Sequence, residues 1–187
     1  MKVQPWGADV DDAFLADVLS PALGEPISAV FYEVPAGGHW PDGHRSLRVH
    51  EVDQSVWIRL GSNSWLVFSW AMDGLREGLA VELTVSGMPD SIANGDLLDV
   101  SSIPDWMSQL GGSIVGIAVT WHVPNEGCPE MPWSFRLDLS NGSSVVIALG
   151  EADGSAFAYS PDSLLVFFDS ELARGYRIPA SSTSSFG

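Results

Sequence analysis

Apolar and polar residues alternate with a period of two along much of this chain, which is typical of strands that bury one face. The alternation is clearest over residues 79–85, 115–123 and 134–139, where bulky apolar residues occupy every second position. Each of these runs predicts a half-buried strand. Further strands are predicted at Ile27–Val34, Ser46–Val52, Ser55–Leu60, Trp65–Ala71, Ser144–Leu149, Ala156–Ser160 and Leu164–Asp169.

Two short turn sequences connect some of these runs. Asn141-Gly142 lies between two apolar runs, and Asn-Gly tolerates the positive φ angles of a type I′ turn. We therefore predict a hairpin of Trp133–Ser140 with Ser143–Leu149. The sequence Gly61-Ser62-Asn63-Ser64 predicts a second hairpin between the two strands that flank it.

Helical signals are few and short. Asp9 or Asp11 is placed to cap a helix that runs to about Leu19, and a second helix is predicted from Pro104 to about Leu110. Ser170 to about Gly175 predicts one last helical turn. Because short antiparallel strands dominate, the predicted fold is mainly β, or β-rich α+β. Its strands are expected in a sandwich or barrel-like arrangement with two or three short helices.

The length of 187 residues fits one globular domain, which we assign to residues 1–179. Residues 180–187 are a Ser-rich tail that we expect to be disordered. A short internal sequence similarity raises the alternative of two related β-halves. The sequences Trp57-Ile58-Arg59-Leu60 and Ser134-Phe135-Arg136-Leu137 each precede a Ser-Asn turn and an apolar strand, with Arg59 matching Arg136. The competing interpretation is that hairpins simply share turn chemistry.

The charge balance restricts the classes of partner. Eight basic residues stand against twenty-four acidic ones, which gives a net charge of −16. Such a chain repels phosphate backbones and anionic membranes, so we expect neither nucleic acid nor a membrane as a partner. Charged residues make up only 17% of the chain against a typical ~25%, so the chain is poor in bases rather than rich in acids. A basic protein partner, a genome bias against Lys and a salt-rich habitat all fit this balance.

Cysteine usage and the first residues predict the compartment. Cys128 is the only cysteine, which excludes an intrachain disulfide, and the chain starts without the apolar run of a signal peptide. The most apolar stretch, residues 114–123, is too short to span a bilayer. We therefore expect a cytoplasmic protein.

The segment from Trp121 to Trp133 joins two of the clearest predicted strands and contains three prolines. Loops held by a rigid sheet commonly carry function, so we take as candidate binding residues Trp121, His122, Glu126, Glu130 and Trp133. His122 and Cys128 are weak metal candidates. Their spacing matches no zinc pattern, so we predict no metal and no cofactor. The competing interpretation is a stiff connection in which Cys128 packs as a small hydrophobe.

A second candidate loop contains His39, Trp40 and His44. These side chains could converge on a substrate or cation, although the glycines and prolines around them favour an exposed turn. A joint site would require the fold to bring this loop to the His122–Glu130 segment.

Catalytic signatures are missing from the sequence. It contains no Gly-x-Ser-x-Gly elbow, phosphate loop or dinucleotide fingerprint. Glu126 and Glu130 flank Cys128 and would suppress its thiolate, which argues against a reactive cysteine. Whether the chain is an enzyme stays open, and the sequence favours the answer that it is not.

The run from Trp121 to Gly150, with its motif Ser134-Phe135-Arg136-Leu137-Asp138-Leu139, resembles a segment of small uncharacterised bacterial proteins. That resemblance implies no activity and no functional residue. By composition the chain is also similar to the cytoplasmic immunity proteins of bacterial toxin systems, many of which are small, acidic proteins that mask a basic toxin surface.

Three functional hypotheses follow. The first is a non-enzymatic, immunity-like domain that binds a basic protein. The second is a small-molecule- or metal-binding β-domain, or a weak enzyme, which uses the His- and Trp-containing loops. The third is a structural domain that associates with its own copies, and the oligomeric state is not predicted.

Overall fold

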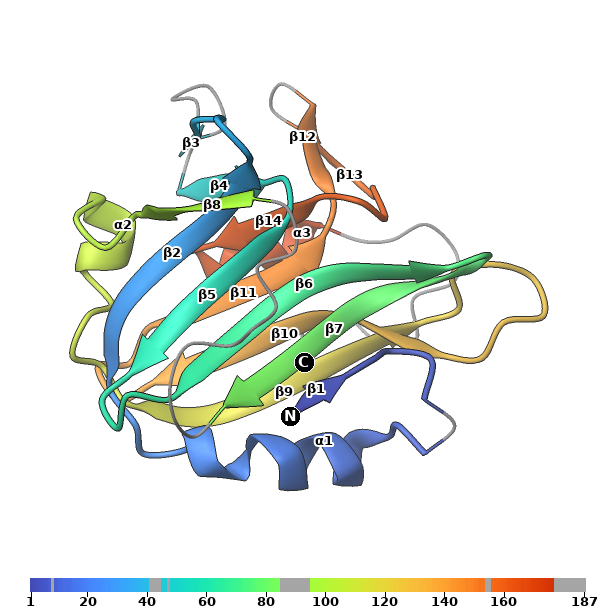
Figure 1. The fold of residues 1–187 in the computed structure, drawn as a ribbon, viewed down its shortest axis with the longest axis horizontal. Coiled ribbons are helices and arrows are strands. Elements are labelled where there is room, and N and C mark those ends of the chain that lie inside the picture. The colour runs from blue at the N-terminus through green and yellow to red at the C-terminus, as the bar shows by residue number, and fades with distance from the viewer. Residues whose placement is uncertain (8, 41–44, 47, 85–94, 154–155, 177–187) are drawn as a thin grey trace.

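The computed structural model describes residues 1–187 except 8, 41–44, 47, 85–94, 154–155 and 177–187 (Figure 1). The predicted tail at 180–187 and the candidate His44 therefore lie outside the described residues. Two six-stranded antiparallel sheets face each other, so the structure shows the sandwich of the two predicted arrangements.

Sheet I and sheet II contribute six strands each. Sheet I consists, in spatial order, of β1 (Lys2–Val3), β7 (Arg76–Thr84), β6 (Trp65–Asp73), β5 (Ser55–Leu60), β2 (Ile27–Pro35) and β8 (Gly95–Asp99). Sheet II consists of β3 (Arg45–Ser46), β4 (Val49–Val52), β14 (Leu164–Phe167), β11 (Ser144–Leu149), β10 (Met131–Leu139) and β9 (Ile114–His122). A separate ribbon pairs β12 (Glu151–Asp153) with β13 (Ala156–Ala158).

The helices are short and lie outside the sheets. Helix α1 (Asp12–Leu19) begins where the Asp11 carboxylate accepts a hydrogen bond from the Phe14 amide, and a 3₁₀ turn, η1 (Ser20–Ala22), follows it. Helix α3 (Ser170–Gly175) agrees with its prediction. Helix α2 (Pro104–Met107) ends before the predicted Leu110, because the chain there turns into a backbone ladder described below.

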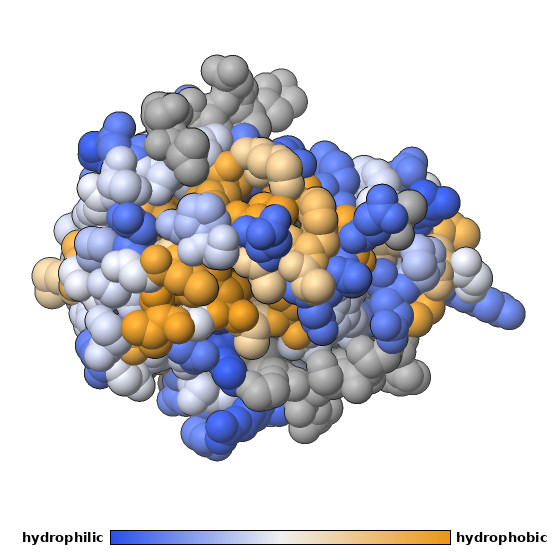
Figure 2. Space-filling view, turned by 90° about the horizontal axis from the view of Figure 1, so that it is seen from below, coloured by the Kyte–Doolittle hydropathy of each residue, from blue (hydrophilic) through white to orange (hydrophobic). Residues whose placement is uncertain are grey.

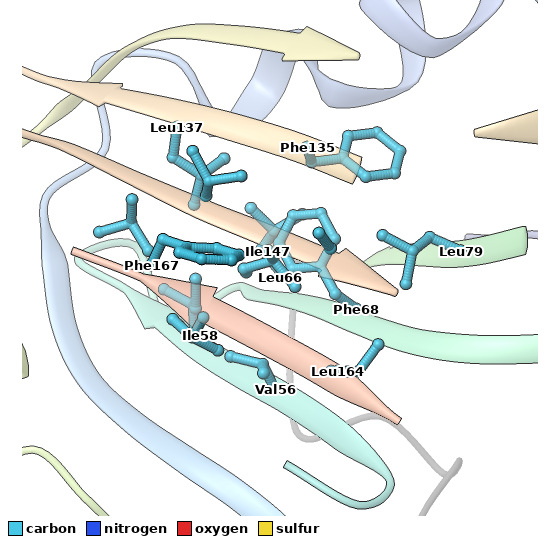
Figure 3. Close-up of a cluster of buried hydrophobic side chains, with 14 of the residues drawn as sticks. Val56, Ile58, Leu66, Phe68, Leu79, Phe135, Leu137, Ile147, Leu164 and Phe167 are labelled. Atoms are coloured by element: carbon cyan, nitrogen blue, oxygen red, sulfur yellow. The ribbon is translucent and has the colours of Figure 1, made fainter. Parts of the chain in front are cut away.

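The core lies between the two sheets. Figure 3 shows side chains from both sheets pointing into one shared layer, and the Phe68 and Phe135 ring centroids are 5.2 Å apart across it. The residues labelled there are all buried: Val56, Ile58, Leu66, Phe68, Leu79, Phe135, Leu137, Ile147, Leu164 and Phe167. Burial of Leu79, Val81 and Leu83 in β7 and of Phe135, Leu137 and Leu139 in β10 confirms the period-two prediction for these two strands.

Each sheet contains the same four-stranded meander, in the order β2-β5-β6-β7 in sheet I and β9-β10-β11-β14 in sheet II. The registers agree at every pair that both meanders contain, and both first strands carry a bulge at their second residue, Ser28 or Val115. Corresponding pairs include Phe31–Trp57 with Ala118–Arg136, Ile58–Leu66 with Leu137–Val145, and Phe68–Val81 with Ile147–Val166.

A reciprocal backbone ladder joins the two meanders at residues 24–27 and 111–114. The Gly24 amide donates to the Ile114 carbonyl (2.8 Å), and the Gly111 amide donates to the Ile27 carbonyl (2.9 Å). The Ile114 amide donates to Glu25 and the Ile27 amide to Gly112, both at 3.0 Å. If residues 24–27 and 111–114 are exchanged, the same four hydrogen bonds result. The two meanders are therefore related by an approximate twofold axis.

This correspondence matches the residues of the two halves differently from the internal sequence similarity. Leu60 and Leu139 make equivalent turn bonds, to Asn63 and to Gly142. Arg59, which precedes Leu60, therefore corresponds to Asp138. The predicted match of Arg59 with Arg136 is wrong by two positions.

The two hairpins are confirmed, but the type I′ turn predicted at Asn141-Gly142 is wrong. Gly142 has φ +82°, whereas Asn141 is not among the described non-glycine residues with positive φ. The loop has three residues, with Gly142 in the left-handed position of a bulged turn. Asn63 takes that position in the other hairpin, with φ +66°.

Other differences concern strand ends and edges. The strand predicted at Ser46–Val52 is divided into β3 and β4 by a turn at Arg48, whose φ is +63°. The prediction of which face of β9 is buried is wrong. Val115, in the bulge, is 60% exposed, and Ile117, Val119 and Trp121 of the same predicted face are half-buried. Thr120 and His122, on the face predicted to be polar and exposed, are buried. Three strands, β1, β8 and β12, were not predicted. The sequence of β8, Gly-Asp-Leu-Leu-Asp, lacks alternation, and its pairing with β2 is tertiary.

We predict that the two ladder glycines are equally sensitive to substitution. Gly24 and Gly111 have φ angles of +85° and +79°, and the space that an alanine Cβ would occupy is open at both. G24A and G111A should therefore each lower the free energy of unfolding by about 1–2 kcal/mol, through backbone strain alone. Gly175 also has open space but no positive φ, so G175A should have no such cost. Urea denaturation measures all three, and a much larger loss for only one ladder glycine would contradict the twofold relation.

Candidate functional site

In the loop after β2, the described candidate residues are His39 and Trp40. His39 is exposed, and Trp40 is half-buried against His50, with ring centroids 4.7 Å apart. The Trp40 indole N–H donates to the Glu51 carbonyl at 2.7 Å. Trp40 therefore fastens this loop to β4.

The candidate residues of the 121–133 segment point in different directions. His122 is fully buried, and its Nε2–H donates to the Glu77 carbonyl at 3.0 Å. Trp133 is fully buried in the core against Tyr176, whereas Glu126 and Glu130 are exposed. Tyr159 donates to the Glu77 carboxylate at 2.7 Å, so Glu77 anchors several groups at this end of the sandwich.

The described candidates of the two loops, Trp40 and His122, do not lie together. Trp40 packs on β4 and His122 ends β9, and three strands of sheet II, β14, β11 and β10, lie between β4 and β9. Cys128 donates to the Leu75 carbonyl through its thiol, at 3.4 Å. Within the described part of the chain, no group of three or more His, Cys, Asp or Glu side chains is arranged to hold a metal ion.

A buried polar network that sequence reasoning missed links Tyr32, His50 and Asp105. The Tyr32 hydroxyl lies 2.7 Å from His50 Nδ1, and His50 Nε2 lies 3.3 Å from the Asp105 carboxylate. The Trp106 indole N–H donates to the Tyr32 hydroxyl at 2.6 Å. Because Tyr32 accepts from Trp106, its own proton is directed at His50 Nδ1, and Nε2–H is directed at Asp105.

The order hydroxyl, imidazole, carboxylate is that of a nucleophilic triad, but the nucleophile here is inaccessible. Tyr32 and His50 are both fully buried, and burial raises the pKa of the Tyr32 hydroxyl well above its usual value. A buried, protonated phenol cannot attack a substrate in solvent. The network instead attaches α2, which carries Asp105 and Trp106, to strands β2 and β4.

An apolar groove of about 530 Å³ runs between α1 and β9. Figure 2 shows apolar side chains gathered on this face of the molecule with hydrophilic ones around them. The groove is lined by Asp12, Leu15, Ala16, Leu19, Leu23, Gly116, Ile117, Ala118 and Val119. Its volume is in the range of ligand-binding clefts, about 300–1,000 Å³.

Two contacts mark the ends of the groove. At one end the Gly24 amide is bonded to the Ile114 carbonyl of the ladder. At the other end the Trp121 indole N–H donates to the Asp12 carboxylate at 2.7 Å. Beyond that bond lies a smaller hollow of about 210 Å³, which we call the acidic hollow and which is lined by Val10, Asp11, Asp12, Trp121 and Glu130.

The groove and the acidic hollow together offer apolar surface, negative charge and backbone groups. Among the described residues that line them, none is Lys or Arg. Among the described strands, β10 is the neighbour of β9 in sheet II. Of the predicted site residues, Trp121 and Glu130 contribute here. The alternation of Ile117 and Val119 marked a strand, but nothing in the sequence marked it as an edge strand beside a helix.

Comparison with protein-family models, curated proteins and solved structures found no match for this chain. Every helix in the described part of the chain is too short or too polar to cross a membrane.

The buried His122 predicts a pH dependence of stability. Burial lowers the pKa of His122, and the Glu77 carbonyl bond opposes only part of this shift. The unfolded chain then binds a proton near pH 6.5 that the folded chain does not, so the stability contributed by neutral His122 is present above about pH 6.5 and is lost below it. The variant H122Q keeps an N–H donor for Glu77. Its stability deficit should shrink between pH 7 and pH 5 in urea denaturation, and a constant deficit would contradict a buried neutral imidazole.

Proposed function

We propose that this chain is a non-enzymatic protein-binding domain that docks a basic partner in the groove between α1 and β9. The observation that carries the proposal is that the apolar groove and the acidic hollow at Asp11, Asp12 and Glu130 are neighbours that share Asp12. An apolar patch rimmed by polar groups is the usual mark of an interaction site.

The chemistry of the groove defines the occupant. It is an extended segment of another protein that places apolar side chains on Leu15, Leu19 and Ile117 and a Lys or Arg beside Trp121. The indole and the carboxylates there would bind a cation together. The net charge of −16 would steer such a partner over longer distances.

The charge and the resemblance to immunity proteins support one form of this proposal. In that form the chain has an immunity-like role and masks a basic toxin in the cytoplasm. The alternative is a small-molecule site built from the His- and Trp-containing loops. It has less support, because His39 and His122 lie at separate places in the fold and neither lines the groove or the acidic hollow.

The groove is tested with a displayed library of random linear peptides selected on the immobilised protein. We expect enrichment of peptides that combine apolar residues with Lys or Arg. The exposed Ala16 lines the groove, and A16Q should weaken their binding by about tenfold because a polar side chain then occupies apolar volume. The exposed Ala13 of the same helix does not line the groove, so A13Q is the matched control. No enrichment, or equal binding by the two variants, would refute the proposal.

The role of the acidic hollow is tested by removing the charge of Glu130, in the loop between β9 and β10. Glu130 lines the hollow and Glu126 does not, and both side chains are exposed. E130Q should weaken binding of the selected basic peptides by a few-fold and flatten its salt dependence, whereas E126Q should leave both nearly unchanged. Fluorescence anisotropy at low and high salt measures the difference. Identical salt dependence in the two variants would show that the hollow takes no part.

A further inference from the structure

The loop between β9 and β10, residues 123–130, is fastened by polar contacts to the turn that joins β6 and β7 (Figure 1). The Asn125 side-chain amide donates to the Leu75 carbonyl at 2.7 Å, and the Cys128 thiol donates to the same carbonyl at 3.4 Å. Every residue of this loop is half-buried or exposed, and Leu75 is 65% exposed. Because little apolar surface is buried here, detaching the 123–130 loop costs less than unfolding the sandwich.

The last residue of β9, His122, is the fully buried group at the start of this loop. Its Nε2–H donates to the Glu77 carbonyl, so the neutral imidazole has its lone pair on Nδ1. Nδ1 is buried and has no hydrogen-bond partner among the described residues. In His50, which is also buried, the Tyr32 hydroxyl engages one ring nitrogen and the Asp105 carboxylate engages the other. Of these two histidines, only His122 has a ring nitrogen without a partner.

A second ring proton on His122 would lie on Nδ1, where the described residues offer it no acceptor. The charged group that acts on His122 from β7 is the Glu77 carboxylate, whose oxygens already accept from the Tyr159 hydroxyl (2.7 Å) and the Asn125 amide (3.4 Å). The Tyr159 ring lies against the His122 ring, with centroids 5.6 Å apart, and burial raises the pKa of Tyr159, so it stays neutral. A buried ion without a partner is costly, so the charged imidazole is favoured only where water reaches it.

We propose that protonation of His122 detaches the 123–130 loop from β7 and removes Trp121 and Glu130 from the acidic hollow, so that binding of the basic partner depends on pH. Trp121 directly precedes His122, and Glu130 directly precedes Met131, which pairs with His122 across the sheet. Both lining residues therefore lie at the base of the loop. The inference rests on the proposed function where it concerns the partner, whereas the opening of the loop rests on the contacts of His122.

The direction of the pH dependence follows from proton binding. In the closed form, burial lowers the pKa of His122, whereas the open form exposes an imidazole with the ordinary pKa of 6.5. Below about pH 6.5 the open form therefore binds a proton that the closed form does not. The population of the open form rises as the pH falls, by up to about tenfold per pH unit for one proton. By reciprocity, a basic segment bound in the acidic hollow favours the closed form and opposes protonation.

The opening is measured in the free protein by NMR, as solvent exchange of the Trp121 indole N–H, which donates to the Asp12 carboxylate in the closed form. The ratio of its exchange rate in the wild type to that in H122Q should rise about tenfold between pH 7 and pH 5.5. Taking the ratio cancels the intrinsic pH dependence of exchange. The Trp106 indole, which donates to the buried Tyr32 hydroxyl, is the internal control, and its ratio should stay constant. A constant ratio for Trp121 would overturn the proposal.

A second measurement needs the wild type alone. NMR titration of the His122 imidazole should show faster exchange of the Trp121 indole over the same pH range in which His122 takes up its proton. An imidazole that titrates while the Trp121 indole remains protected would overturn the proposal, because His122 would then be charged within the closed form.

The effect on the partner is measured with a basic peptide selected from the library, by fluorescence anisotropy at pH 7 and pH 5.5. Its affinity should fall at least about threefold more for the wild type than for H122Q, and H39Q, which changes an exposed histidine, should behave as the wild type. Faster indole exchange with equal losses of affinity in the wild type and H122Q would overturn the pH control of binding. Faster exchange with no enrichment from the library would refute the proposed function and leave the opening of the loop standing.

Discussion

The reciprocal backbone ladder between residues 24–27 and 111–114 is the contact on which the rest of this fold depends. Its four hydrogen bonds, of 2.8 to 3.0 Å, join the starts of β2 and β9 and so bring one meander face to face with the other. Gly24 and Gly111 make the ladder possible, because each holds a left-handed backbone conformation before its strand. The shared core, from Phe68 to Phe135, follows from that orientation.

The places where the two halves differ are the places where function could arise. One half uses the segment before its helix as strand β8, which covers the edge of β2. The other half begins a longer helix, α1, and leaves an apolar groove along β9 that ends in carboxylates. An apolar groove with carboxylates at one end is better explained as a binding surface than as a defect of packing.

Buried polar groups, by contrast, hold the scaffold together. The Tyr32–His50–Asp105 network attaches α2 to both sheets, and the His122–Glu77–Tyr159 cluster closes the opposite end of the sandwich. Each contains a histidine that a sequence reader would consider for catalysis. Full burial of His50 and His122 instead makes these contacts structural, since a solvent-borne substrate cannot reach them.

The sequence by itself determined much of the local structure: the positions of most strands, the Asp-capped first helix and the two hairpins, because side-chain period and turn chemistry act over a few residues. It also determined the charge, and it marked Trp121 and Glu130 among the candidates. Only the tertiary structure decided that the loops of Trp40 and His122 lie apart and that β9 is an edge. Strand order depends on backbone bonds between distant residues, such as Ile27 with Gly112, and leaves no local pattern in the sequence.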